Sequence, residues 1–248
     1  MVISTHPQST LSLFDGFELR CSGQRVELPM VAQRLVALLA IHDRPLLRAF
    51  VAGTLWPDKT DARSLANLRS VLWRLRRPEE ELVQSCGSHI KLADCVDVDV
   101  RRLVRLTTDL LAGADVAPSR ETNQLLTAGE FLPGWYDDWV QVERERLGQL
   151  RQHAMEAMCA RLTELKRYGE AVDVGLAAVG ADPLRESARS ALIAAHFAEG
   201  NAVEAIRQYK AYRVLLWKSL QVKPGPKLES FIAACLPRPD RTPARAVS

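Results

Sequence analysis

The side chains whose chemistry is clearest lie between residues 59 and 77, where six are basic and one is acidic. Arg63, Asn67, Ser70 and Arg74 recur there at helical spacing, and Arg77 continues the same row. Arginine and asparagine form bidentate hydrogen bonds to guanine and adenine, and further cations neutralise phosphates. The pattern therefore predicts a helix that reads DNA, with a solvated basic helix face as the alternative.

The candidate DNA-binding set also includes side chains that would hold the phosphate backbone. Lys59 and Arg69 belong to the same basic segment, and His89 and Lys91 lie near the tip of a hairpin predicted to follow it. Cations at both places would grip the duplex while the helix faces a major groove. The full predicted set is Lys59, Arg63, Asn67, Arg69, Ser70, Arg74, Arg77, His89 and Lys91.

Three helices are predicted to position this row. Trp56-Pro57-Asp58 separates a short helix over 46–55 from the basic helix, which Thr60 or Asp61 would cap, so that two helices meet across a tight turn. The stripe predicted to face the core from the basic helix is Leu65, Leu68, Leu72 and Leu75. A third helix is predicted over 31–41, with an inner face of Val31, Leu35, Leu38 and Leu39.

Short strands are predicted on either side of these helices. Residues 11–28 alternate apolar and polar around turns at Asp15-Gly16 and Ser22-Gly23, which predicts three antiparallel strands. Residues 82–98 suggest a hairpin that turns near 86–88. Strands, three helices and a terminal hairpin predict an α+β winged helix-turn-helix of the OmpR type.

The second half of the chain is predicted to be all-α, with an internal repeat. Glu170-Ala171-Val172 returns as Glu204-Ala205-Ile206, and the offset is the 34-residue period of tetratricopeptide repeats. Such repeats form protein-contact surfaces. The aromatic residues expected to be packing rather than partner contacts are Trp135, Trp139, Tyr209, Tyr212 and Trp217.

These residues resemble a known family in two places. The strand meander, the Leu55-Trp56-Pro57 step, the basic run and the hairpin resemble the DNA-binding domain of the Streptomyces antibiotic regulatory protein (SARP) family. Residues 129–147 resemble the opening of the bacterial transcriptional activator domain that follows in that family. The resemblance covers about residues 10–236 in the same order. Its predicted division is 1–105 for the DNA-binding domain, 106–124 for a linker, 125–236 for the activator domain and 237–248 for a disordered tail.

The resemblance also implies a function. A protein of this kind would bind double-stranded promoter DNA as a pair of copies on direct repeats. It would recruit RNA polymerase through the sigma factor, the beta flap or the alpha C-terminal domain, and it would activate an antibiotic biosynthetic gene cluster. The alternatives are a tetratricopeptide adaptor whose winged helix binds no DNA, and a ligand-responsive regulator or repressor.

Composition narrows the remaining classes. The net charge of +3 is small, and no apolar run approaches the ~20 residues that span a membrane, so we expect a cytoplasmic, nucleoid-associated protein. Five scattered cysteines favour reduced thiols, and Cys86, His89 and Cys95 lack a fourth ligand for zinc. Phosphate-binding loops and common catalytic motifs are missing from the sequence, so we predict no enzyme activity, metal or cofactor.

Overall fold

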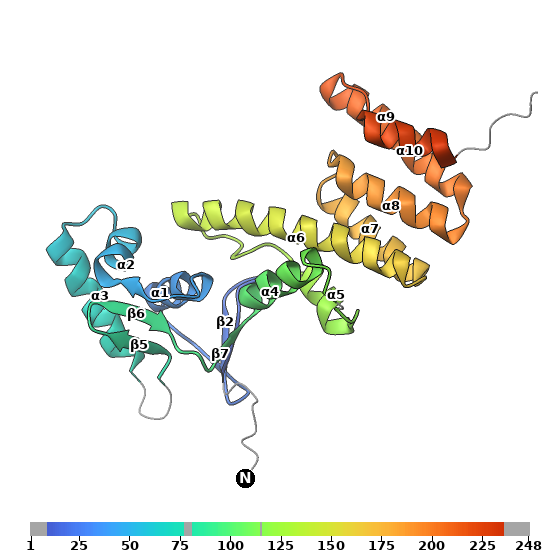
Figure 1. Cartoon of the computed structure of the whole chain (residues 1–248). Coiled ribbons are helices and arrows are strands. Elements are labelled where there is room, and N and C mark those ends of the chain that lie inside the picture. The colour runs from blue at the N-terminus through green and yellow to red at the C-terminus, as the bar shows by residue number, and fades with distance from the viewer. Residues whose placement is uncertain (1–8, 77–80, 115, 236–248) are drawn as a thin grey trace, which may run out of the picture. The chain divides into compact units, whose positions relative to one another are not determined.

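The computed structural model describes residues 9–76, 81–114 and 116–235. These residues form two compact units, which divide after Arg151 (Figure 1). The first unit, up to residue 151, combines two small sheets with helices, and the second consists of helices. Among the described residues, none of the helices is both long and apolar enough to cross a membrane.

One sheet of the first unit confirms the predicted meander and adds a strand. Its order is β3-β2-β1-β7, with β1 at Ser9–Ser12, β2 at Glu18–Cys21, β3 at Gln24–Val26 and β7 at Val96–Val98. The first three strands pair antiparallel, with Leu11 opposite Leu19, whereas β7 runs parallel to β1, with Val98 opposite Leu11. The sequence pattern placed β7 in the hairpin, which is wrong. It leaves the hairpin because Val96 and Val98 are buried beside Ser9 and Leu11, the two buried residues of β1.

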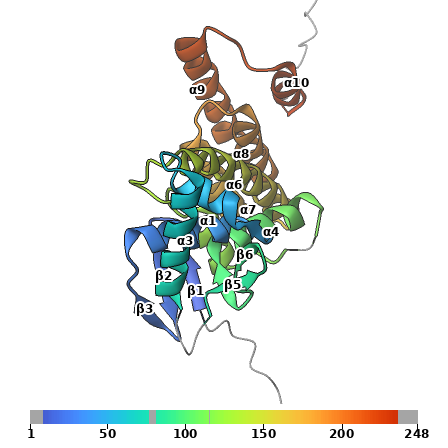
Figure 2. The ribbon, with the colours of Figure 1, turned by 90° about the vertical axis from the view of Figure 1, so that its left-hand side faces the viewer.

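The predicted helices and hairpin are also present. Helix α1 spans Met30–Ile41, α2 spans Arg48–Leu55 and α3 spans Asp61–Leu75, while β5 (Val83–Cys86) and β6 (His89–Leu92) form the hairpin. The side of the first unit that carries α3 is turned toward the viewer in Figure 2, and α3 runs across its front. These elements bring α3 and the hairpin into one surface region.

Two details of these helices differ from the prediction. Leu46–Leu47 is not the first turn of a helix but a short strand, β4, because it pairs with His89 and Ile90 of the hairpin. Val31 is 38% exposed and does not belong to the inner face of α1. The other predicted inner residues of α1 are buried, together with Ala32, Val36, Ala37 and Ala40.

Helix α4, at Asp99–Leu111, is fastened to the sheet and to α1 by its first residues. The carboxylate of Asp99 accepts hydrogen bonds from the N–H groups of Leu13 (2.7 Å), Phe14 (3.1 Å) and Val100 (2.7 Å). Burial raises the pKa of Asp99 above its ordinary value, and the three N–H donors act in the opposite direction. Arg101 donates to carbonyls at the C-terminal end of α1, which are those of Leu39, Ala40 and His42.

The last part of the first unit packs against residues next to the N-terminal strands. Helix α5 spans Arg120–Leu126, and the extended segment after it donates from the Leu132 N–H to the Leu13 carbonyl (2.9 Å). Trp135 stacks on Phe17 with ring centroids 6.3 Å apart. The opening residues of the predicted activator domain therefore lie within the first unit.

Helix α6 spans Asp138–Glu164, and the helices after it belong wholly to the second unit: α7 (Tyr168–Ala181), α8 (Glu186–Glu199), α9 (Ala202–Leu220) and α10 (Pro226–Cys235). Ala171 and Ala205, which occupy equivalent places in the repeat, are both fully buried. Small side chains at these positions let neighbouring helices pack closely. Gly200 ends α8 with φ of +91°, a backbone conformation that favours glycine, and the Asn201 side chain then caps α9.

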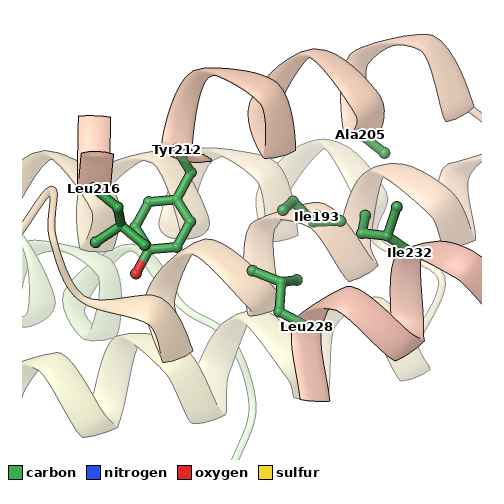
Figure 3. Packing of buried hydrophobic residues seen from close by; sticks show 6 residues of the cluster. All are labelled: Ile193, Ala205, Tyr212, Leu216, Leu228 and Ile232. Atoms are coloured by element: carbon green, nitrogen blue, oxygen red, sulfur yellow. The ribbon is translucent and has the colours of Figure 1, made fainter. Parts of the chain in front are cut away.

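The core of the last three helices is built around Tyr212. Figure 3 shows its ring beside Leu216 on the inner face of α9, with Ile193 of α8 and Leu228 of α10 facing the same space. The Tyr212 hydroxyl donates to the carbonyl of Leu184 (3.0 Å), so the buried ring keeps its polar atom paired. Tyr212 is core as predicted, whereas Trp217 is not: it is 54% exposed, because it lies on the outer face of the same helix.

Candidate nucleic-acid interface

Helix α3 sits in the first unit with one face buried, but the buried face is not the one that leucine spacing predicted. Leu68 and Leu75 are buried, whereas Leu65 and Leu72 are only partly buried. Ser64 and Val71 complete the buried face. The small Ser64 side chain can be buried because its hydroxyl donates to the Trp56 carbonyl (3.2 Å), which also ties α3 to the preceding turn.

The predicted base-reading row lies on the outside of α3. Arg63, Ser70 and Arg74 are exposed, and Asn67 is half-buried. Neither arginine has an ion-pair partner within the described residues. The Ser70 hydroxyl donates to the Ala66 carbonyl (3.1 Å), which leaves its oxygen as an acceptor toward solvent. The structure thus brings together four of the five residues in the row, and Arg77 lies outside the described residues.

Two of the cations predicted to hold phosphates lie in the turn before α3 and on α3 itself. Lys59 is exposed in the turn before α3, and its N–H donates to the Trp56 carbonyl (3.2 Å). Arg69 is exposed on α3, beside a cavity of about 660 Å³ that separates the helix from strand β5. Both side chains are therefore accessible from solvent.

The hairpin brings His89 and Lys91 onto the face of β6 that points away from buried Ile90 and Leu92. Gly87 makes the turn with φ of +59°. The Lys91 ammonium group already pairs with Asp94 (2.6 Å). A phosphate contact by Lys91 would have to compete with this carboxylate.

Three further residues of the cavity beside α3 were missed by the sequence reasoning. Trp73 is 73% exposed, and Arg48 and Arg76 line the same cavity. The position of Trp73 off the leucine stripe could have singled it out. Arg48 could not be found from sequence, because it comes from α2 and reaches the hairpin only in the folded chain, where it donates to the Ser85 hydroxyl (3.0 Å).

The cysteines differ in their surroundings. None of the five forms a disulfide; Cys21 and Cys159 are buried, whereas Cys86 and Cys95 are exposed. In the described part of the chain, no three histidine, cysteine or acidic side chains are grouped in a way that could hold a metal ion.

Comparison with known families agrees with this arrangement. The sequence profile of the bacterial transcriptional activator domain matches residues 96–236, which is more than half of the chain, and the chain belongs to this family. The resemblance to the SARP family is thereby confirmed, and the class of protein is a transcription regulator of that type. The profile begins before residue 125, where we expected the domain to start; the division into domains stays a prediction.

Two curated relatives from Streptomyces support the same assignment. Regulatory protein AfsR of Streptomyces coelicolor is 28% identical over 221 residues, which cover 82% of this chain and 21% of the relative. AfsR of Streptomyces griseus is 28% identical over 225 residues, covering 86% of this chain and 22% of that protein. The chain therefore spans about a fifth of the length of these relatives.

A solved structure shares the fold. It is that of Mycobacterium tuberculosis EmbR in complex with a low-affinity phosphopeptide, with a TM-score of 0.72 and 18% sequence identity. The match covers 92% of this chain and 65% of that one. At this identity the likeness concerns the fold: a small N-terminal sheet region followed by helices.

Proposed function

We propose that this chain is a sequence-specific DNA-binding transcription activator. The single observation behind the proposal is the geometry of α3, a helix packed into the first unit on one face while it exposes Arg63, Ser70 and Arg74 on another. These side chains have the hydrogen-bonding shape that base edges and phosphates require.

The proposed architecture of the DNA-binding part is a winged helix-turn-helix of the OmpR type. In it, α2 and α3 form the helix-turn-helix and the β5–β6 hairpin is the wing. Helix α3 would enter the major groove, while Lys59, Arg69 and the wing hold the backbone. The helices from α6 to α10 would form the tetratricopeptide-like activator domain, and the predicted boundaries at 105, 124 and 236 belong to this proposal.

The proposed partners follow from the family. Two copies would lie side by side on a direct repeat, since head-to-tail sites need no two-fold axis between the DNA-binding parts. The surfaces of the bound copies that do not touch DNA would contact RNA polymerase at the sigma factor, the beta flap or the alpha C-terminal domain. The regulated genes would be those of a biosynthetic cluster, and the mechanism requires no catalysis, metal or cofactor.

A gel-shift titration tests the proposal. The full chain is titrated against promoter DNA from its own genomic neighbourhood, with competitor DNA and at several salt concentrations. We expect a specific complex whose affinity falls as salt is added. The plot of log affinity against log salt concentration should have a slope of about −0.9 for each phosphate contact. Equal binding to promoter and competitor would contradict sequence-specific recognition and favour the adaptor alternative.

A further inference from the structure

The outer face of α9 and the turn that follows it combine exposed apolar side chains with cations. Val214, Trp217 and Val222 are 51%, 54% and 47% exposed, and all three line a groove of about 530 Å³. A single exposed apolar residue is ordinary, but a contiguous apolar patch with a polar rim is typical of an interaction site. The DNA-reading proposal uses none of these residues.

The turn between α9 and α10, which forms one end of the groove, is held by specific contacts. Helix α9 ends at Gln221 in a left-handed conformation (φ 58°), and the chain turns back through a buried proline, Pro224, into α10. The N–H of Gly225 donates to the Glu186 carboxylate of α8 (2.7 Å), which holds this turn in place. Helix α10 then packs against the inner side through Leu228 and Ile232, as Figure 3 shows, and it leaves the outer face of α9 uncovered.

The rim of the groove is basic. Arg213, Lys218 and Lys223 line it together with one acidic residue, Glu229. None of the three cations forms an ion pair within the described residues. Over residues 202–225 the sequence has five basic side chains and one acidic one. The occupant therefore needs negative charge around an apolar centre.

We propose that this groove binds an acidic amphipathic helix of a partner protein, whose bulky apolar side chains cover Trp217 and the two valines. Helices of this kind dock by apolar residues at i, i+3, i+4 and i+7, while their charged residues meet the rim. The volume of about 530 Å³ lies within the ~300–1,000 Å³ range of binding pockets.

Three other occupants fit less well. DNA would satisfy the cations but would offer nothing apolar to Trp217. A second copy in a symmetric contact would oppose the basic rim to itself. The chain's own last residues, 236–248, hold three arginines and one aspartate, so their charge has the same sign as the rim.

Fluorescence polarisation with a designed peptide tests the proposal on the full chain and without DNA. The probe is a fluorescein-labelled amphipathic helix of about 15 residues with leucine and phenylalanine on one face and glutamate on the other. Two control peptides replace every glutamate by lysine, or every apolar residue by serine. We expect saturable binding of the acidic peptide, and binding at least about tenfold weaker for both controls.

Matched variants locate the site. We expect Trp217→Ala and Lys218→Glu each to weaken binding of the acidic peptide by about tenfold or more. Arg207→Glu makes the same charge change on the same helix but outside the groove, and its effect should stay within about twofold. Circular dichroism of each variant checks that the helices are retained.

Several results would overturn the proposal: no saturable binding, equal binding of the lysine peptide, or equal affinities for Trp217→Ala and wild type. Displacement of the peptide by random-sequence duplex DNA would assign the groove to nucleic acid. Self-association that Trp217→Ala abolishes, seen by sedimentation equilibrium, would assign it to a second copy. Since the assay contains no promoter, its failure is distinguishable from failure of the DNA-binding proposal.

Discussion

Helices α3 and α9 have the same ingredients in different arrangements. Each buries one face, exposes a tryptophan and has an excess of basic side chains. On α3 the cations alternate with Asn67 and Ser70, which are hydrogen-bonding side chains that suit base edges. On α9 and in the turn after it they surround Trp217 and two valines, a setting that suits an apolar partner surface. Both helices have an excess of positive charge, so the different partners that we propose for them rest on the side chains between the cations.

The comparison requires that α3 face the core with Leu68 rather than with Leu72. Leu68→Asp would place a charge at a site that is 1% exposed, so we expect it to destabilise the first unit by at least about 4 kcal/mol. Leu72→Asp alters a partly buried residue beside the cavity and should cost less, about 1–3 kcal/mol. Urea denaturation followed by circular dichroism measures both. Equal losses would mean that the orientation of α3 is wrong.

The Asp99 carboxylate joins the start of α4 to Leu13 and Phe14, which directly follow β1. Asp99→Ala would leave three backbone N–H groups without their acceptor, and we expect a loss of about 3 kcal/mol or more in the free energy of unfolding. Asp97→Ala, two residues earlier, removes ion pairs with Arg102 and Arg105 and should cost less than about 1 kcal/mol. Thermal denaturation of both variants decides whether the two carboxylates differ in this way.

The proposed difference in function between α3 and α9 is tested by Arg74→Ala. Arg74 is exposed and has no ion pair in the described structure, so the variant should fold normally while promoter affinity falls by about 1–3 kcal/mol. Arg120→Ala removes an exposed arginine from α5 of the same unit and should leave the gel shift unchanged. Wild-type promoter affinity in a folded Arg74→Ala protein would remove this residue from the site.

On the inner face of α9, removing one hydroxyl group is expected to cause a small loss of stability. Tyr212→Phe keeps the buried ring and removes the hydroxyl that donates to the Leu184 carbonyl, at a cost of about 1 kcal/mol. Trp217→Phe on the outer face removes no described hydrogen bond and should change stability by less than about 0.5 kcal/mol. A larger effect of Trp217→Phe, in urea denaturation, would indicate that the outer face is packed.

Alkylation of cysteines distinguishes buried from exposed positions without any substitution. Burial raises the pKa of the Cys159 thiol to about 11, whereas Cys86 is exposed on the hairpin. We expect iodoacetamide at pH 8 to modify Cys86 and to leave Cys159 intact, as peptide mass spectrometry would show. Because folding disfavours the Cys159 thiolate, stability from this group is lost as the pH rises from about 9 toward 11. Rapid modification of Cys159 at pH 8 would contradict its burial.

Much of the fold could be predicted because it rests on local patterns. Alternating residues and turn glycines predicted β1 to β3 and the hairpin, and helical spacing predicted α1, most of α2 and α3. The row from Arg63 to Arg74 was found the same way, because solvent-facing residues need no partner to define them. Inner faces were less predictable: leucine spacing selected Leu72, but the fold buries Ser64 and Val71 instead.

By itself, the sequence determined most of the helices and strands, where positive charge gathers and which family the chain resembles. Only the tertiary structure decided which side of α3 is buried, that β7 pairs with β1, that Arg48 reaches the hairpin, and that Trp217 lies beside a groove rather than in the core. The reason is physical. Periodicity and turn chemistry act over a few residues, whereas burial and ion pairing depend on neighbours that folding brings from distant parts of the chain.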